Sequence, residues 1–181
     1  MKRLIILCAG LLAASASALE VGDQVAPFSA KDQDGGEWKL EERLRGKPIV
    51  VYFYPAAMTG GCTKQACSYR DYVMKGDPKF TVVAVSGDSV QNLKWFQTAE
   101  QLNFPLLSDP DGSIAKAFGV PVREGEKAIT RTVDGKEVEL KRAVTSARWT
   151  FIIGPDGKIA YKSDQVKPTA DLENVLAFLL K

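Results

Sequence analysis

The stretch IVVYFYPAAMTGGCTKQAC, residues 49–67, predicts a strand, a loop and the beginning of a helix in direct succession. Its opening run IVVYFY is continuously apolar, which is typical of a strand buried on both faces of a sheet. A short loop from Pro55 to Gly61 follows, and the segment from Cys62 to about Met74 has no internal helix breaker. Cys62 is therefore expected in the first turn of a helix that follows a buried strand.

Strands and helices alternate along the rest of the chain. We expect a hairpin about residues 34–36, strands at 79–86 and 104–109, helices after Ser89 and at 111–119, two strands within 148–163, and a last helix carrying Leu172, Val175, Leu176 and Leu179. The charged stretch 121–145 contains a Val-Asp-Gly turn and predicts an exposed hairpin insertion. This alternation predicts an α/β domain with a mixed sheet.

The composition fits one globular domain. The chain has 181 residues, of which 45% are hydrophobic and 25% are charged. It shows no repeats, no low-complexity segments and no linker long enough to separate two domains. We therefore expect a single domain over residues 19–181.

Residues 1–18 have the pattern of a secretory signal peptide. Lys2 and Arg3 precede an apolar run over residues 4–14, and small residues at 16–18 predict cleavage before Leu19. The expected mature protein is exported and periplasmic.

Two other interpretations of this segment are weaker. A membrane anchor needs a longer apolar run, and a lipoprotein anchor on Cys8 needs a small residue where Leu7 stands. Loss of residues 1–18 removes two of the 24 basic residues and none of the 22 acidic ones, so the mature net charge is zero. A neutral chain gives no sign of a nucleic-acid partner or of stable membrane association.

Cleavage leaves two cysteines, Cys62 and Cys67, for which a structural disulfide is the default interpretation in an exported protein. In a continuous helix, Cα atoms five residues apart are separated by about 8.7 Å. A disulfide needs roughly 4.4–6.8 Å between Cα atoms. A Cys62–Cys67 bond must therefore unwind part of the helix, which favours a reversible bond formed after chemistry at Cys62.

The chain contains no histidine, yet a helix N-terminus can stabilise a thiolate through its free backbone N–H groups and its dipole. Without histidine, Ser-His-Asp catalysis is excluded, and a structural zinc site has too few ligands. The stretch TGGCTK also lacks the spacing of a phosphate-binding P-loop. Of the chemistries considered, the sequence therefore favours thiol chemistry at Cys62.

The pattern Pro55-x-x-x-Thr59-x-x-Cys62 resembles the P-x-x-x-T-x-x-C signature of the peroxiredoxins. CTKQAC followed by Arg70-Asp71 is similar to the bacterioferritin comigratory protein, or peroxiredoxin Q, branch of that family. Similar stretches extend over nearly the whole mature chain: VGDQVAPFSAKDQDGG, VVAVSGDS, FPLLSDPDGSIAKAFGV and RWTFIIGPDGKI. The resemblance implies a thioredoxin-like α/β fold with a mixed central sheet flanked by helices, and a peroxidase without metal or organic cofactor.

The resemblance also implies a role for each matching residue. Cys62 would be the peroxidatic cysteine, whose thiolate attacks the peroxide O–O bond and becomes a sulfenic acid. Cys67 would be the resolving cysteine, which condenses with that acid to form a disulfide. Thr59 would hydrogen-bond the peroxide, and Pro55 would shield the thiolate from water. Arg148 would stabilise the thiolate and the charge developing on the oxygens.

By the same resemblance, Gln65 helps to orient that arginine. The implied partners are hydrogen peroxide or an organic hydroperoxide and a thioredoxin-like reductant, and the expected assembly is a monomer or weak dimer. The chain departs from the family pattern in two places. It has Thr59-Gly60-Gly61-Cys62 where many members have Thr-Pro-Gly-Cys, which makes the loop more flexible. The insertion 121–145 is also longer than the compact family core suggests.

Other function classes stay open on sequence grounds. A thiol-disulfide oxidoreductase acting on proteins would share the fold and compartment, but it is expected to carry C-x-x-C. A copper chaperone of related fold would want histidine or methionine beside a cysteine pair. A noncatalytic domain with a structural disulfide predicts an unreactive Cys62.

Overall fold

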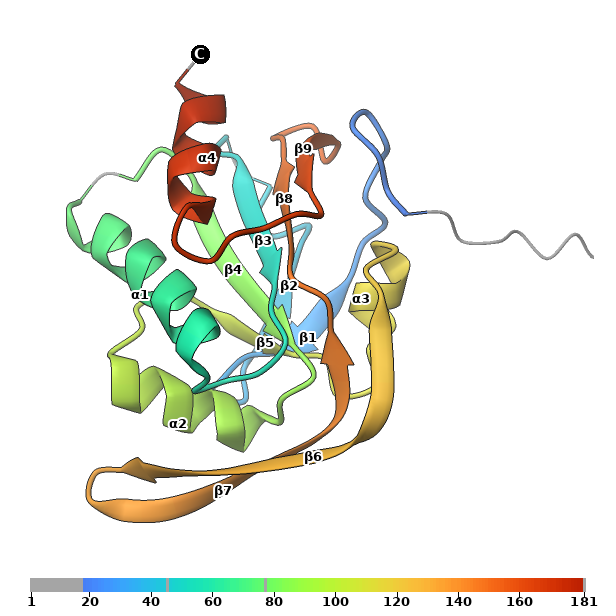
Figure 1. Cartoon of the computed structure of the whole chain (residues 1–181). Coiled ribbons are helices and arrows are strands. Elements are labelled where there is room, and N and C mark those ends of the chain that lie inside the picture. The colour runs from blue at the N-terminus through green and yellow to red at the C-terminus, as the bar shows by residue number, and fades with distance from the viewer. Residues whose placement is uncertain (1–17, 45, 77, 181) are drawn as a thin grey trace, which may run out of the picture.

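A computed structural model describes residues 18–44, 46–76 and 78–180 (Figure 1). The expected signal peptide, residues 1–18 with Cys8, lies outside the described residues except for its last one. Within the described ranges, no helix combines the length and the apolar character that crossing a membrane requires.

A five-stranded mixed sheet forms the centre of the molecule, in the order β5-β4-β3-β8-β9. The central strand β3 is parallel to β4 and antiparallel to β8. The strands are β3 Ile49–Phe53, β4 Thr81–Ser86, β5 Leu106–Ser108, β8 Trp149–Ile153 and β9 Ile159–Ser163. The expected mixed sheet flanked by helices is confirmed.

Two buried clusters, one on each face of this sheet, form the core. The first cluster joins α1, α2 and α4 to the sheet, and the second joins α3 and the small β1–β2 hairpin to it. The bounds are α1 Gly60–Met74, α2 Val90–Glu100, α3 Ser113–Ala117, α4 Asp171–Leu179, β1 Ser29–Lys31 and β2 Glu37–Lys39.

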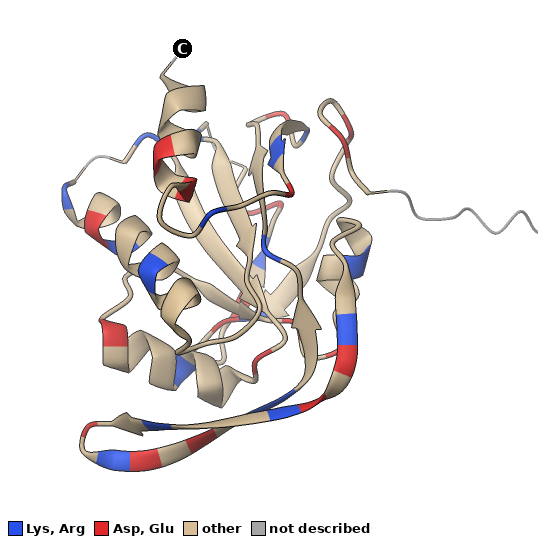
Figure 2. Cartoon of the chain, viewed as in Figure 1, with Lys and Arg blue, Asp and Glu red and all other residues tan. Residues whose placement is uncertain are grey.

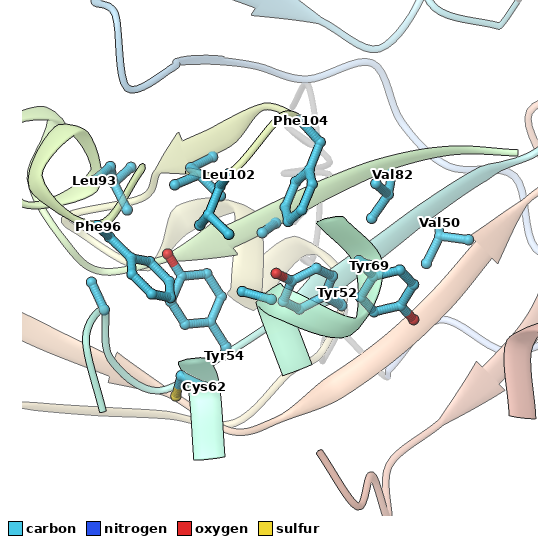
Figure 3. Packing of buried hydrophobic residues seen from close by; sticks show 14 of the residues in the cluster. Val50, Tyr52, Tyr54, Cys62, Tyr69, Val82, Leu93, Phe96, Leu102 and Phe104 are labelled. Atoms are coloured by element: carbon cyan, nitrogen blue, oxygen red, sulfur yellow. The ribbon is translucent and has the colours of Figure 1, made fainter. Parts of the chain in front are cut away.

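Successive side chains of β3 enter opposite clusters. Val50 and Tyr52 lie in the first cluster, whereas Val51 and Phe53 lie in the second. Because both faces are buried, the run is apolar without alternation. Cys62 lies at one edge of the first cluster (Figure 3).

A long hairpin connects α3 to β8. Its strands are β6 Val122–Val133 and β7 Lys136–Ser146, and the turn residues Asp134 and Gly135 both have positive φ, at 50° and 76°. Two positive φ angles are what a tight two-residue hairpin turn of type I′ requires. Acidic and basic residues are distributed along the strands of the hairpin (Figure 2).

The outer face of the hairpin is exposed, and its inner face is partly buried. Leu140 and Val133 are buried in the first cluster, and Ile129 packs against it. Side chains on a strand alternate between its faces, so these residues share an inner face turned toward the helices. The expectation of an exposed insertion therefore holds for the outer face and for Arg131 on the inner face, but not for Val133 and Leu140.

Candidate active site

Cys62 is the third residue of α1, in its first turn, and only 2% of its surface is exposed. The helix begins at Gly60, two residues earlier than expected. Thr59 is the N-cap residue, and its carbonyl accepts the bond from the Thr63 N–H at 2.8 Å. The Thr59 hydroxyl does not cap the helix but donates to the Ala56 carbonyl at 3.0 Å. The N–H groups of the first turn are thus not taken up by a side-chain cap, and they favour negative charge at this position.

Arg148 brings a positive charge to the same sulfur. Its Nη2 donates to Cys62 Sγ at 3.2 Å, although 86 residues separate the two in the chain. Arg148 directly precedes β8, which is antiparallel to β3, and Cys62 follows β3 through a short loop. The sheet therefore brings together the two residues that the sequence resemblance pairs. A guanidinium at this distance provides a charge-assisted hydrogen bond to a thiolate.

Gln65 holds the arginine from the other side. Its side-chain oxygen accepts a short bond from Arg148 Nη1, and its amide Nε2 donates to Asp171 Oδ2 at 2.7 Å. Gln65 lies one turn after Cys62 on α1 and is completely buried. The guanidinium is thus fixed between sulfur and amide oxygen.

Asp171, the first residue of α4, is the end of this chain of bonds. Its Oδ2 also accepts from the Tyr69 hydroxyl at 2.8 Å and the Thr150 hydroxyl at 3.0 Å. Burial raises the pKa of the Asp171 carboxyl, and the hydrogen bonds from Gln65, Tyr69 and Thr150 offset part of that rise. Sequence reasoning missed this residue, because an acidic residue in the first turn of a helix ordinarily reads as a partner of the helix dipole.

Pro55 lies on the loop that leads to Thr59 and lines a pocket of 340 Å³. The other residues around this pocket are Pro121, Arg123, Thr145, Ser146 and Ala147. Ala147 directly precedes Arg148, so the pocket borders the segment that carries the arginine.

Both cysteines are free, and one continuous helix contains them. Cys67 is partly buried and its Sγ donates to Glu100 Oε2 at 3.5 Å, at the C-terminal end of α2. Burial raises the pKa of the Cys67 thiol; the charge of Arg70 opposes that rise and Glu100 adds to it. The two sulfurs therefore have different partners, and a disulfide between them requires α1 to change shape.

The described part of the chain contains no cluster of three or more histidine, cysteine, aspartate or glutamate side chains placed to hold a metal ion.

Comparison with known proteins gives consistent matches. Residues 21–162 match the AhpC/TSA family. Peroxiredoxin Bcp of Escherichia coli K12 is 38% identical over 163 residues, covering 89% of this chain and 96% of that protein. The crystal structure of peroxidoxin BcpB from Mycobacterium tuberculosis is 34% identical, with a TM-score of 0.72 over 90% of this chain and 97% of that one.

A third match is a structure of the Xanthomonas campestris bacterioferritin comigratory protein, described for its alkyl peroxide reduction activity. It is 26% identical, with a TM-score of 0.70 over 91% of this chain and 97% of that one.

Proposed function

The chain belongs to the AhpC/TSA family as a peroxiredoxin of the Bcp and peroxiredoxin Q type, a thiol-dependent peroxidase, and on this premise we propose its reaction in detail. Cys62 is the peroxidatic cysteine and Cys67 the resolving one, in an exported enzyme that reduces hydrogen peroxide or organic hydroperoxides. The contact that carries this proposal is the 3.2 Å bond from Arg148 Nη2 to Cys62 Sγ at the helix N-terminus.

In the first step, the Cys62 thiolate attacks one oxygen of the peroxide, and the O–O bond breaks. The sulfur becomes a sulfenic acid, and the other oxygen leaves as water or an alcohol after taking a proton. Arg148 donates to the sulfur in the resting site and is placed to donate to the oxygens as charge moves onto them. The Thr59 hydroxyl donates its hydrogen bond to the Ala56 carbonyl. The hydroxyl oxygen of Thr59 can therefore accept a hydrogen bond from the peroxide O–H.

In the second step, the Cys67 sulfur attacks the sulfenic sulfur of Cys62. The S–O bond breaks, the hydroxyl leaves as water with the proton of the Cys67 thiol, and a disulfide forms. Cys67 must leave Glu100 and α1 must unwind between the two cysteines, because both lie in one helix.

In the third step, a dithiol reductant returns two electrons and breaks the disulfide by thiol exchange. Peroxiredoxins use thioredoxin-like proteins for this step, and export would require a reductant of that kind outside the cytoplasm. Alkyl peroxide reduction by the Xanthomonas campestris relative supports organic hydroperoxides as substrates. The signal-peptide pattern of residues 1–18 supports export to the periplasm. A protein-directed oxidoreductase is not favoured, because the chain lacks C-x-x-C.

A single-turnover reaction tests these roles. The reduced mature protein receives one equivalent of hydrogen peroxide, and free thiols and intact mass are followed in wild type, Cys62→Ser and Cys67→Ser. We expect rapid loss of both thiols in wild type, a trapped sulfenic acid in Cys67→Ser and no reaction in Cys62→Ser. A wild-type rate no higher than that of free cysteine would reject the proposal. Fractionation of cells that produce the full chain tests export, which predicts a periplasmic protein beginning at Leu19.

A further inference from the structure

The loop between β3 and α1 positions Thr59 and Cys62, yet its own sequence does little to fix it. Gly60 and Gly61 occupy the first two positions of α1, and glycine loses more conformational freedom on folding than any other residue. Met58, directly before Thr59, has a φ of 57°, a left-handed conformation that is unfavourable for a residue with a Cβ atom. Such a backbone persists when surrounding structure determines it.

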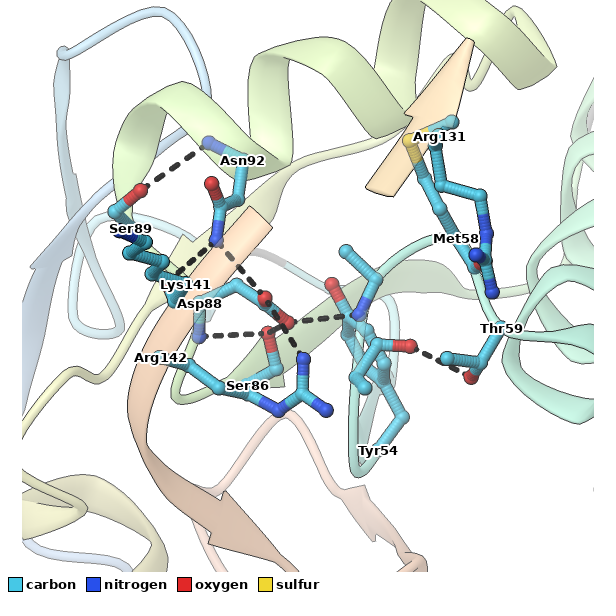
Figure 4. A network of polar contacts seen from close by, with 12 residues as sticks. Tyr54, Met58, Thr59, Ser86, Asp88, Ser89, Asn92, Arg131, Lys141 and Arg142 are labelled. Atoms are coloured by element: carbon cyan, nitrogen blue, oxygen red, sulfur yellow. Dashed lines mark hydrogen bonds and ion pairs between the residues drawn. The ribbon is translucent and has the colours of Figure 1, made fainter. Parts of the chain in front are cut away.

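The β6–β7 hairpin supplies that surrounding structure at two peptide groups of the loop. Arg131 of β6 donates from Nε to the Met58 carbonyl at 2.8 Å (Figure 4). Ser146, at the end of β7, donates from its hydroxyl to the Tyr54 carbonyl at 3.1 Å. These two bonds hold the loop just before Pro55 and just before Thr59.

A third attachment runs through a buried carboxylate. Asp88 Oδ2 accepts the Ala57 N–H at 2.8 Å, so it holds the middle of the loop. Arg142 of β7 lies with its Nη1 3.9 Å from Asp88 Oδ1, and the side chains of both are buried. Asn92 of α2 donates to Asp88 Oδ1 at 3.2 Å and to the Lys141 carbonyl at 2.8 Å (Figure 4).

The position of Arg131 follows from the hairpin register. Arg131 is paired with Val138, and Ile129 with the buried Leu140, so these side chains share the inner face of the hairpin. Packing of Leu140 and Ile129 in the first cluster sets the hairpin beside the loop, and the exposed Arg131 then reaches the Met58 carbonyl.

We propose that the β6–β7 hairpin is a clamp on the catalytic loop, with Arg131 as the positioning residue that fixes the Met58 carbonyl and thereby Thr59 and Cys62. The clamp supplies order that a more rigid residue at position 60 would otherwise supply. Arg131 donates to the Met58 and Thr130 carbonyls and not to the Cys62 sulfur. This inference rests on the proposed role of Cys62.

A substitution at Gly60 can be used to restore order to the loop when the Arg131 bond is removed. A Cβ atom there meets nothing within 4 Å, and Thr59 before it is extended, with φ −110° and ψ 147°. Proline is favoured at the first position of a helix and requires an extended residue before it. A Cβ atom on Gly61 would make ordinary contacts with Pro168 at 3.4 Å and with Arg148 Nη2 at 3.6 Å, so Gly60 is the position that leaves the surroundings of the arginine unchanged.

The test compares Arg131→Leu, Arg131→Leu with Gly60→Pro, and Gly60→Pro alone. The control is Lys127→Ala, which removes one positive charge from an exposed position of the same strand, opposite Arg142. The readout is the second-order rate of Cys62 oxidation by hydrogen peroxide in stopped flow, together with the melting temperature of each reduced variant.

We expect Arg131→Leu to slow Cys62 oxidation about tenfold, the effect of losing one charge-assisted hydrogen bond. Gly60→Pro should recover most of that loss, and should change the rate less than about twofold in the wild-type background. Gly60→Ala restricts the same residue less and should recover a smaller part. Lys127→Ala should react like wild type.

A rate in Arg131→Leu equal to that of Lys127→Ala would overturn the clamp. So would a loss of rate that neither Gly60 substitution restores, because that pattern indicates general destabilisation. Fast oxidation of wild type together with either result rejects the clamp alone, whereas slow oxidation of wild type rejects the proposed function itself.

Discussion

Asp171 accepts a hydrogen bond from Gln65 at 2.7 Å, although 106 residues separate them in the chain. Gln65 in turn accepts from the guanidinium of Arg148, which contacts the sulfur of Cys62. The first residue of the last helix is thereby joined to the reactive thiol through two side chains. Asp171 reaches the sulfur only through Gln65 and Arg148, so its effect on the reaction is one of positioning.

Asp171→Asn should slow Cys62 oxidation several-fold. An amide oxygen is neutral and has two lone pairs, so it cannot serve Gln65, Tyr69 and Thr150 as the carboxylate does. We expect a rate about three- to tenfold lower, measured by stopped flow. Asp164→Asn, an exposed substitution just after β9, is the control. Equal oxidation rates for Asp171→Asn and Asp164→Asn would show that Asp171 does not position the groups around Cys62.

The stability of the same variant should depend on pH in a defined direction. Because the pKa of Asp171 is raised in the folded state, the unfolded chain releases this proton first as the pH rises. The free energy of unfolding of wild type should therefore fall relative to Asp171→Asn from about pH 4 upward, the ordinary range of aspartate. Urea titrations at several pH values measure the difference. A widening wild-type advantage between pH 4 and 7 would contradict the raised pKa.

Arg148→Lys should lower the rate of Cys62 oxidation by about 10²-fold. A lysine keeps the charge but lacks the planar fork that contacts the Cys62 sulfur and the Gln65 oxygen together. Arg43→Lys, at an exposed position, is the matched control. A loss of less than threefold in Arg148→Lys would show that charge alone is sufficient.

Glu100→Gln should speed the resolving step at neutral pH. Burial raises the pKa of the Cys67 thiol, and the nearby groups that act on it are Arg70 and Asp71 on α1 and Glu100 on α2. The attacking form is the thiolate, and removal of the Glu100 charge should lower the pKa of the Cys67 thiol. The pH at which disulfide formation becomes fast should therefore be lower in Glu100→Gln than in wild type. Rapid quench and mass spectrometry from pH 6 to 9 follow sulfenic acid and disulfide separately.

Glu137→Gln, at the exposed tip of the hairpin, is the control for this substitution. A slower resolving step in Glu100→Gln would indicate that the carboxylate instead helps to remove the thiol proton. The rate of the first step, oxidation of Cys62, should be the same in wild type, Glu100→Gln and Glu137→Gln.

Oxidation should unfold the part of α1 between the cysteines. Gln65 lies in that part, so its bonds to Arg148 and Asp171 should break with it. Amide exchange should then rise over residues 62–70 in the disulfide form, and also at the first turn of α4, which loses donors to Asp171. Mass-spectrometric exchange of the reduced and oxidised proteins tests this. Equal protection of residues 62–70 in both forms would contradict it.

Much of the fold follows from local patterns in the sequence. The continuous apolar run of β3 indicates burial on both faces, and the two clusters of the core confirm it. Ser89 caps α2 as its sequence position predicts, by accepting from the Asn92 N–H at 3.2 Å. These features depend on neighbours a few residues away, so the sequence contains the information directly.

The site is predictable only in part. The position of Cys62 in the first turn of α1 could be predicted from the sequence patterns of the strand, loop and helix around it. Asp171 and Arg131 act through partners 106 and 73 residues away, and no periodicity or motif reports such a contact. The inner face of the hairpin was missed for a related reason. Charged residues dominate the stretch, and the burial of Leu140 depends on packing against the helices.

The location of Gln65 between the two cysteines also bears on the reduction potential of the disulfide proposed between them. Helical bonds and the contacts of Gln65 are lost when the disulfide forms, and they return when it is reduced. Their free energy therefore favours reduction, and each 1.4 kcal/mol of it raises the potential by about 30 mV. The intact helix of the reduced enzyme thus makes its disulfide a stronger electron acceptor for whichever dithiol regenerates it.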